Sequence, residues 1–213
     1  MRQIMTRTLT ALLVAAVLGT PLHAEEKVDS GAYLAARIAE SENDFRAAST
    51  WYAKAIIADA QNPQLLDGAI LAEIGVGDFA LATEAAKLRK GIKGEASQLA
   101  EIALVADEAK REDYAALIAG AKGGRDMGDL ANQLVTAWAK VGEGKMSEAL
   151  EEFDAVTKKK GYEAFGFYHK ALALASVGDF EGADEILSGK AAGPIVVMRR
   201  GVFAHAQILS QLE

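Results

Sequence analysis

Cysteine is absent from this sequence of 213 residues. Its absence excludes disulfide bonds, thiolate nucleophiles and cysteine-ligated zinc, so packing alone must stabilise the folded chain. Apolar residues make up 51% of the composition and charged residues 25%, which is a normal balance for a globular protein and not for a disordered one. The chain is therefore able to bury a core.

The sequence also lacks an apolar run long enough to cross a membrane, which takes about 18 to 20 residues. The run near its start, Leu9 to Gly19, has eleven residues, follows Arg2 and Arg7, and leads to the small residue Ala24. This pattern is typical of a secretory signal peptide and predicts that residues 1–24 are removed. An exported chain without disulfides fits a bacterial periplasm, with secretion as the second choice. After cleavage we expect no stable insertion in the membrane.

Catalytic and metal-binding patterns are missing too. His23 belongs to the signal peptide, and His169 and His205 have no third ligand at a metal-site spacing. The glycines of residues 120–128 follow no strand pattern and precede no Lys-Ser/Thr pair, both of which a phosphate-binding loop requires. No serine has a nucleophile-elbow pattern. The sequence therefore predicts that the protein is not an enzyme and holds no metal or cofactor.

Acidic residues outnumber basic ones. The full chain has 30 acidic and 23 basic residues, and removal of Arg2 and Arg7 with the signal peptide leaves 30 against 21, a formal charge of −9. A surface of this sign disfavours nucleic acid and anionic membranes as general partners.

One short stretch occurs twice. Val76-Gly77-Asp78-Phe79, with Ala82 three residues on, returns as Val177-Gly178-Asp179-Phe180 with Ala183. The interval between the two glycines is 178 − 77 = 101 residues, one less than three times 34. A period of about 34 residues is that of a repeated helix-turn-helix unit.

Looser copies of this stretch occur elsewhere in the chain. Asn43-Asp44-Phe45 is a turn in which Asn replaces the glycine, because Asn is the next residue to tolerate a left-handed backbone. Ala48, Tyr52 and Ala55 follow at helical spacings of four and three and so share one face. A small residue, a Gly-Asp-aromatic turn and an Ala-aromatic-Ala stripe together resemble the tetratricopeptide repeat (TPR) family, in an exported bacterial form.

The resemblance implies an all-α fold: an α-solenoid, wound as a right-handed superhelix, of about five helix-turn-helix units and a C-terminal helix. The repeat domain would span residues 25–213, with units at about 29–62, 63–96, 97–128, 129–163 and 164–197 and a terminal helix at 198–213. Ile208, Leu209 and Leu212 give that last helix an apolar end. The helix is either the solvating cap that repeat arrays need or the first helix of a sixth unit, and since a cap would have a more polar outer face, the chain could be a fragment of a longer repeat protein.

The third unit and the end of the second unit fit the repeat less well. The third unit has the turn Glu112-Asp113-Tyr114, and the glycines of residues 120–128 predict a linker that is the most flexible point of the array. Arg89 stands where alanine is expected; we interpret it as a cation at a helix end that Gly91 caps in the left-handed conformation, with a basic binding patch as the alternative.

The register of the fourth unit has two solutions. Counting back from Gly144 places Gln133 and Thr136 inside, whereas an apolar stripe consists of Leu130, Leu134, Trp138 and Val141. The stripe is the better physical guide, so we expect a turn lengthened by about two residues around Gly142 to Gly144.

A concave surface lined by the first helix of each unit is where the resemblance places binding. The family's clamp of Lys, Asn and Arg for a terminal carboxylate has no match in this sequence. The side chains predicted to line the groove are Tyr33, Arg37, Leu71, Ile74, Trp138, Phe165, Tyr168 and Leu172. Such a groove would receive a hydrophobic helix or extended segment of a partner. The alternative is that its apolar members are buried between tightly wound repeats.

The function predicted from this pattern is that of a periplasmic interaction scaffold, which binds a protein or peptide of the cell envelope. A module for a small molecule or glycan, or an accessory subunit of an envelope enzyme, is the alternative. The sequence does not indicate an oligomeric state.

Overall fold

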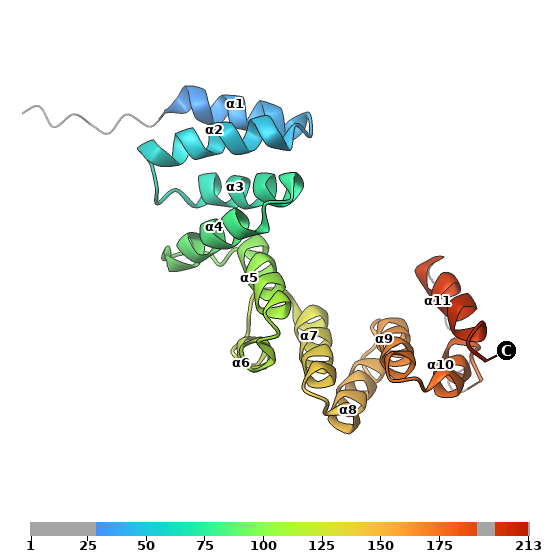
Figure 1. Ribbon diagram of the computed structural model, residues 1–213. Helices are drawn as coiled ribbons and strands as arrows, with labels where there is room; N and C mark the ends of the chain where they lie inside the picture. Colours follow the sequence, from blue (N-terminus) through green and yellow to red (C-terminus); the bar gives the residue numbers. More distant parts are fainter. Residues whose placement is uncertain (1–28, 191–198, 213) are drawn as a thin grey trace, which may run out of the picture.

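A computed structural model describes residues 29–190 and 199–212, so the predicted signal peptide lies outside the described residues. Within these ranges all regular secondary structure is helical, in eleven helices (Figure 1). The all-α prediction is therefore confirmed. None of the described helices has both the length and the apolar character that crossing a bilayer requires.

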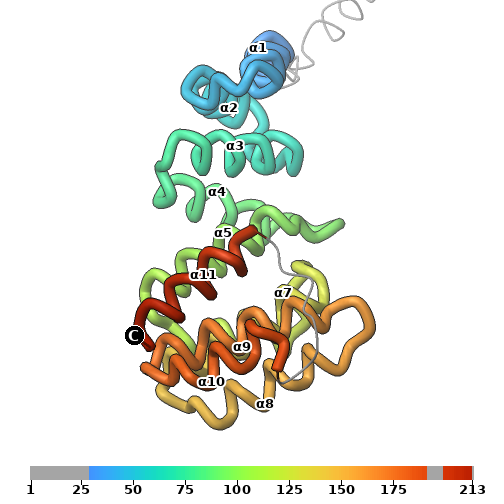
Figure 2. Tube along the Cα trace, turned by 90° about the vertical axis from the view of Figure 1, so that its right-hand side faces the viewer, coloured from blue at the N-terminus to red at the C-terminus, as the bar shows by residue number. Residues whose placement is uncertain are grey.

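The helices are joined by short connections. Their bounds are α1 Ser30–Ser41, α2 Phe45–Ala58, α3 Pro63–Val76, α4 Phe79–Gly91, α5 Gln98–Lys110, α6 Tyr114–Lys122, α7 Asp129–Gly142, α8 Met146–Thr157, α9 Glu163–Ser176, α10 Phe180–Leu187 and α11 Arg199–Leu209. Each helix from α2 to α10 packs against the one before and the one after it. The stack bends near α5 and again beyond α8, so that α11 returns to the height of α5 on the other side of a gap (Figures 1 and 2).

Small side chains dominate the core between neighbouring helices. Alanines of α1 and α2 meet α3 around Tyr52, and Phe153 has the same central place between α7, α8 and α9. Both rings are fully buried. Small residues allow the helices to approach closely, while one large ring in each cluster fills the remaining volume.

The turns inside the units share one geometry, which explains the repeated Gly-Asp pair. One residue in each turn has the left-handed conformation: Asn43, Gly77, Glu112, Gly144 or Gly178, with φ between 56° and 90°. The amide that follows donates to the carbonyl five residues earlier, as from Asp179 to Leu174 at 3.0 Å. The aspartates Asp44, Asp78, Asp113 and Asp179 each cap the next helix with a side-chain oxygen. The turns predicted at residues 43–45, 77–79, 112–114 and 178–180 are confirmed.

Lys145 has the capping position of the fourth unit without a capping oxygen. We expect Lys145→Asp to raise the free energy of unfolding by about 1 kcal/mol. An aspartate at this position can accept a hydrogen bond from a backbone N–H in the first turn of α8, which has no partner within the helix. Chemical denaturation followed by circular dichroism measures the change. Lys93→Asp, which makes the same charge change in a loop, is the control. An equal gain from both variants would show that charge, and not capping, is responsible.

The predicted lengthening of the fourth turn is wrong. Three residues separate α7 from α8, as they separate α1 from α2, and the amide of Lys145 donates to the carbonyl of Lys140 at 2.9 Å as in the other turns. Helix α7 contacts α6, α8 and α9, so neighbouring helices cover more than one of its faces. Residues from both of the alternative registers can therefore be buried. Thr136 is buried and donates its hydroxyl hydrogen to the carbonyl of Asn132 at 2.9 Å, while Leu134, Trp138 and Val141 pack against the cluster around Phe153.

The prediction for the end of α4 is confirmed for Arg89, which lies in the last turn, and is wrong for Gly91. Arg89 is buried, with its Nε 3.2 Å from Asp67 Oδ1 of α3 and its Nη2 donating to the carbonyl of Glu95 at 3.0 Å. It is thus a cation at a helix end, as predicted, and because it is buried it does not belong to an exposed basic patch. Gly91 is the last helical residue of α4, and the left-handed glycine of this connection is Gly94.

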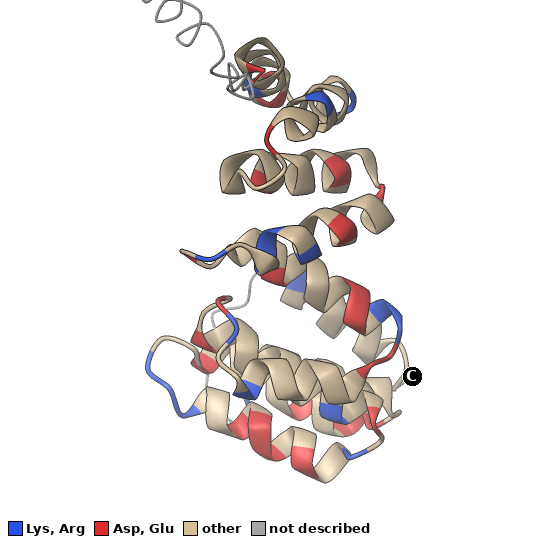
Figure 3. Ribbon diagram, turned by 90° about the vertical axis from the view of Figure 1, so that its left-hand side faces the viewer, with Lys and Arg blue, Asp and Glu red and all other residues tan. Residues whose placement is uncertain are grey.

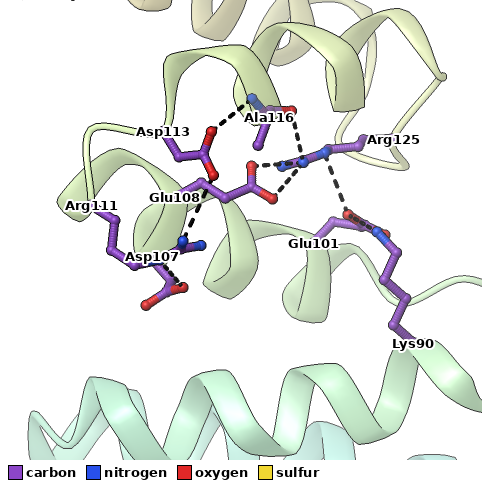
Figure 4. A network of polar contacts seen from close by, with 8 residues as sticks. All are labelled: Lys90, Glu101, Asp107, Glu108, Arg111, Asp113, Ala116 and Arg125. Atoms are coloured by element: carbon purple, nitrogen blue, oxygen red, sulfur yellow. Dashed lines mark hydrogen bonds and ion pairs between the residues drawn. The ribbon is translucent and has the colours of Figure 1, made fainter.

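The glycine-rich connection before α7 is held by specific contacts. Gly120 belongs to α6, and the side chain of Arg125 lies over it. Arg125 Nη2 is 2.7 Å from Glu108 Oε2 (Figure 4). The backbone carbonyl of Arg125 accepts a hydrogen bond from Asn132 Nδ2 at 2.8 Å. These bonds join the connection to both α5 and α7. The predicted linker is thus held at both ends, and its flexibility stays a prediction.

Candidate binding groove between α3, α4 and α5

Aromatic residues at the turns interlock neighbouring units. The ring of Phe45 lies against Gly75 of the next unit, and the ring of Tyr114 lies against Gly142; a Cβ on either glycine would be 2.3 Å from a ring atom. Each glycine stands two residues before the left-handed residue of its own turn. The absence of a side chain at this position allows the aromatic ring of one unit to pack on the next.

The junction between α4 and α5 departs from this arrangement. The position two residues before Glu112 is Lys110, where the other two units have glycine, and the aromatic residue is Phe79. Phe79 is 55% exposed, whereas Phe45 and Tyr114 are half-buried. Lysine carries a side chain where glycine leaves room for a ring at the other two junctions, and here both Phe79 and Lys110 line open space. An open groove results.

The groove has a volume of about 400 Å³. It is lined by Ile74 of α3, by Phe79, Ala80, Ala82 and Thr83 of α4, and by Ile102, Ala103, Ala106, Asp107 and Lys110 of α5. Most of these side chains are apolar, and Ile102 is exposed. A pocket of this size and character is within the range of sites that hold a small ligand or a few side chains of a partner.

The polar groups of the groove are mostly used within the protein. The Thr83 hydroxyl donates to the carbonyl of Phe79 at 2.8 Å, and Asp107 accepts from Arg111 Nε at 2.9 Å. Lys110 forms no ion pair with the residues that the structure describes. The groove thus offers apolar surface and one available cation. Figure 3 shows acidic and basic residues interspersed along the rest of the array.

Of the residues predicted for the first part of the concave surface, those on α1 are exposed and those on α3 are half-buried. Tyr33 and Arg37 are exposed on α1, and Arg37 pairs with Glu40 at 3.0 Å. Glu40 also accepts the hydroxyl hydrogen of Tyr52. Burial, together with this bond, raises the pKa of Tyr52 to about 12. Leu71 and Ile74 are half-buried on α3, and Ile74 lines the groove described above.

Trp138, Phe165, Tyr168 and Leu172 lie on α7 and α9 and are half-buried. Trp138 Nε1 donates to His169 Nδ1 at 3.0 Å, and the ring of Tyr168 meets the edge of the same imidazole with 5.3 Å between centroids. Tyr168 also packs against the core cluster that includes Ala171. The structure therefore links Trp138 and Tyr168 through His169. Their helices, α7 and α9, lie apart from α1, the helix of Tyr33 and Arg37 (Figure 1).

The bond from Trp138 predicts a pH effect on stability, because it requires an unprotonated Nδ1 on His169. Burial lowers the pKa of His169 from its ordinary value of 6.5. Above that value the imidazole is neutral in both states; below it the unfolded chain takes up the proton first, so the folded state loses stability. We expect the melting temperature to fall more between about pH 7.5 and about pH 5.5 in the wild type than in His169→Gln. Parallel pH profiles would contradict this.

The two described histidines have separate partners. His205 Nε2 is 2.6 Å from Asp184 Oδ1, while His169 pairs with Trp138. Within the described residues no group of three or more potential ligands could hold a metal ion.

The sequence prediction missed Phe79, Ile102 and Lys110 as groove residues. The repeat itself indicates this site. When the turns are aligned, Gly75 and Gly142 stand at the position where the third unit has Lys110. A break in an interlocking pair predicts an opening at that junction. Of the two predicted groove residues on α3, Leu71 and Ile74, only Ile74 lines this groove.

Comparison with known proteins gives a likeness in fold. No protein-family model matches the sequence, and no curated protein matches it. A crystal structure of YrrB, described as a TPR protein with an unusual peptide-binding site, aligns over 86% of this chain and 94% of its own, with 19% identity and a TM-score of 0.61. A chain in the structure of Naa15/Naa10 bound to HypK-THB aligns over 97% of this chain and 32% of its own, with 18% identity and a TM-score of 0.47. With its repeated turns and stacked helix pairs, the chain therefore has the fold of a tetratricopeptide-repeat protein.

Proposed function

We propose that this protein is a periplasmic interaction scaffold, without catalytic activity, that binds an apolar segment of a cell-envelope protein in the groove between α3, α4 and α5. The observation that carries the proposal is the open junction at Phe79, where Lys110 replaces the interlocking glycine and leaves apolar surface uncovered. The structurally similar YrrB is described as having a peptide-binding site, which supports a peptide or protein as the occupant.

The groove favours an apolar side chain as the anchoring group. Covering the exposed parts of Phe79 and Ile102 would contribute on the order of 1 kcal/mol for each side chain. Lys110 stands at the edge of the same surface and makes no ion pair with described residues, so an acidic group beside the anchor would gain a partner. The apolar contacts would supply affinity, and the cation would favour one orientation of the segment.

A paired capture experiment tests this function. Three baits are exposed to a periplasmic extract: the purified wild type, Ile102→Glu and Leu88→Glu. Leu88 and Ile102 are both exposed, but only Ile102 lines the groove. We expect a partner that is retained by the wild type and by Leu88→Glu and is lost with Ile102→Glu. A partner retained equally by all three baits would refute the groove as the binding site.

The predicted concave surface of α9 has its own test. In the double variant Tyr168→Ser, Leu172→Ser we expect partner recovery to fall if this surface takes part in binding. A large loss of melting temperature with unchanged recovery would instead assign these half-buried side chains to the core.

The export of the protein is supported by the signal-peptide pattern of residues 1–24. Expression of the full chain in a bacterium, followed by cell fractionation and mass spectrometry, tests it. We expect an N terminus at Glu25 in the periplasmic fraction. An uncleaved chain in the cytoplasm would refute the localisation.

A small apolar molecule is the second candidate for the groove, because about 400 Å³ is within the range of small-ligand sites. A glycan fits less well, since the polar groups of Thr83 and Asp107 already bond within the protein. A thermal-shift screen separates the candidates: stabilisation by a small molecule, lost in Ile102→Glu, without a captured protein would favour the second one.

A further inference from the structure

The two outermost helices of the described array each leave an apolar face uncovered. On α1, Ala32, Ala36 and Ala39 pack against α2 and α3, while Leu34 and Ile38, one helical turn apart, are exposed on another face. On α11, Gly201 and Ile208 are buried, while Val202, Phe203 and Leu209 are exposed. Helices α2 to α10 are instead packed on both sides.

These two faces cannot meet within one chain as it is folded. Helix α1 lies at one end of the stack and α11 beyond its second bend, and the views of Figures 1 and 2 agree in keeping them apart. A contact between them therefore requires two copies of the chain.

Their charges are complementary. Residues 29–44, comprising α1 with its cap and turn, have four acidic residues and one basic residue, a net charge of −3; residues 199–212 have two arginines and no acidic residue, a net charge of +2. Arg199 and Arg200 are exposed and form no ion pair within the described ranges, although Arg199 lies 5.8 Å from the ring centroid of Phe203. Glu42, at the end of α1, is likewise exposed.

We propose that α11 of one copy docks antiparallel on α1 of the next, so that copies associate head to tail. In this orientation Leu34 and Ile38 meet Val202, Phe203 and Leu209, and the arginines at the start of α11 lie beside Glu42 at the end of α1. The contact joins different surfaces of the two copies, so it leaves one free face at each end and continues as an open chain of molecules. An interface made by two helices is small, so the association is weak and reversible.

Sedimentation equilibrium of the purified protein tests the proposal. We expect the average mass of the wild type to rise between about 10 µM and about 1 mM, the range for weak interfaces. Leu34→Glu and Phe203→Glu alter side chains that are each 60% exposed, so both variants should fold, as circular dichroism can verify. Each should remain monomeric alone. Ile38→Glu and Val202→Glu replace them if either fails to fold.

Mixing the two variants is the decisive measurement. Leu34→Glu keeps its α11 face and Phe203→Glu keeps its α1 face, so an equimolar mixture should form a complex of one copy of each and stop there. Leu81→Glu, on α4, should associate like the wild type. A wild type that stays monomeric, a mixture that stays monomeric, or association lost in only one of the variants, as in a symmetric dimer, would overturn the proposal.

Charge reversal tests the orientation. Arg200→Glu should weaken association, and mixing a copy that carries Arg200→Glu and Leu34→Glu with one that carries Glu42→Arg and Phe203→Glu should restore the complex. Unchanged association after the single reversal would overturn antiparallel docking.

Discussion

Replacement of Arg125 by alanine is expected to lower the free energy of unfolding by about 3 kcal/mol, because it leaves the nearly buried carboxylate of Glu108 without its cation. The Arg125 side chain is 8% exposed; its Nη2 is 2.7 Å from Glu108 Oε2 and its Nε is 3.8 Å from Glu101 Oε2. Figure 4 shows both carboxylates directed at the guanidinium from α5. Glu101 keeps Lys90, 2.9 Å away, whereas Glu108 has no other cation among the described residues.

Arg111→Ala is the matched control. Arg111 forms an ion pair with Asp107 at 2.9 Å, but its side chain is 56% exposed, so its loss should change the free energy of unfolding by no more than about 0.5 kcal/mol. Urea denaturation followed by circular dichroism measures both variants. Equal losses would contradict the view that burial of the Arg125 network is what stabilises the third unit.

The same network shows what the sequence could not predict about the third unit. Glycines at residues 120–128 predicted a flexible linker because glycine permits many backbone conformations. The glycines do not indicate the bonds of Arg125 to Glu108, 17 residues earlier, and to α7, which hold this connection. Periodicity identifies which residues share a helical face, but not which distant side chain a charged residue in a connection will reach.

The fourth unit shows a second limit. The apolar stripe of α7 is the better guide to one inner face, but a helix in a solenoid is covered by neighbours on more than one side. Thr136 is buried beside Ala137, on a face that the stripe excludes, because its hydroxyl bonds within the helix. By contrast, the turns were predictable residue by residue: Asn43, Gly77 and Gly178 are all left-handed, and the aspartate after each one caps a helix.

The groove was predictable only in part. The helical register of α3 indicated that Ile74 faces inward, and Ile74 lines the groove. Arg37 was predicted as a groove residue from its register alone, but the structure engages it with Glu40 on the same helix. Register gives the direction of a side chain, whereas its availability to a partner depends on the contacts made by its neighbours. The opening at Phe79 likewise depends on one pair of positions, Phe79 and Lys110.

The second large effect is expected at Gly68 of α3. A Cβ on this residue would lie 2.2 Å from Tyr52 Cζ and 2.5 Å from the hydroxyl oxygen, so Gly68→Ala forces the ring to move. Tyr52 is fully buried and its hydroxyl donates to Glu40, so the ring cannot move without losing packing or that bond. We expect the free energy of unfolding to fall by about 2 to 3 kcal/mol, despite the roughly 1 kcal/mol by which alanine favours a helix over glycine.

Gly91→Ala makes the same chemical change with the opposite expected sign. Gly91 is the last residue of α4 and a Cβ there would have no atom within 4 Å, so alanine should stabilise the protein by about 0.5 to 1 kcal/mol. Thermal and urea denaturation measure both variants. In a Tyr52→Leu background the cost of Gly68→Ala should shrink, because the ring that it displaces is gone. An undiminished cost would show that backbone strain in α3, and not the contact with Tyr52, requires glycine at this position.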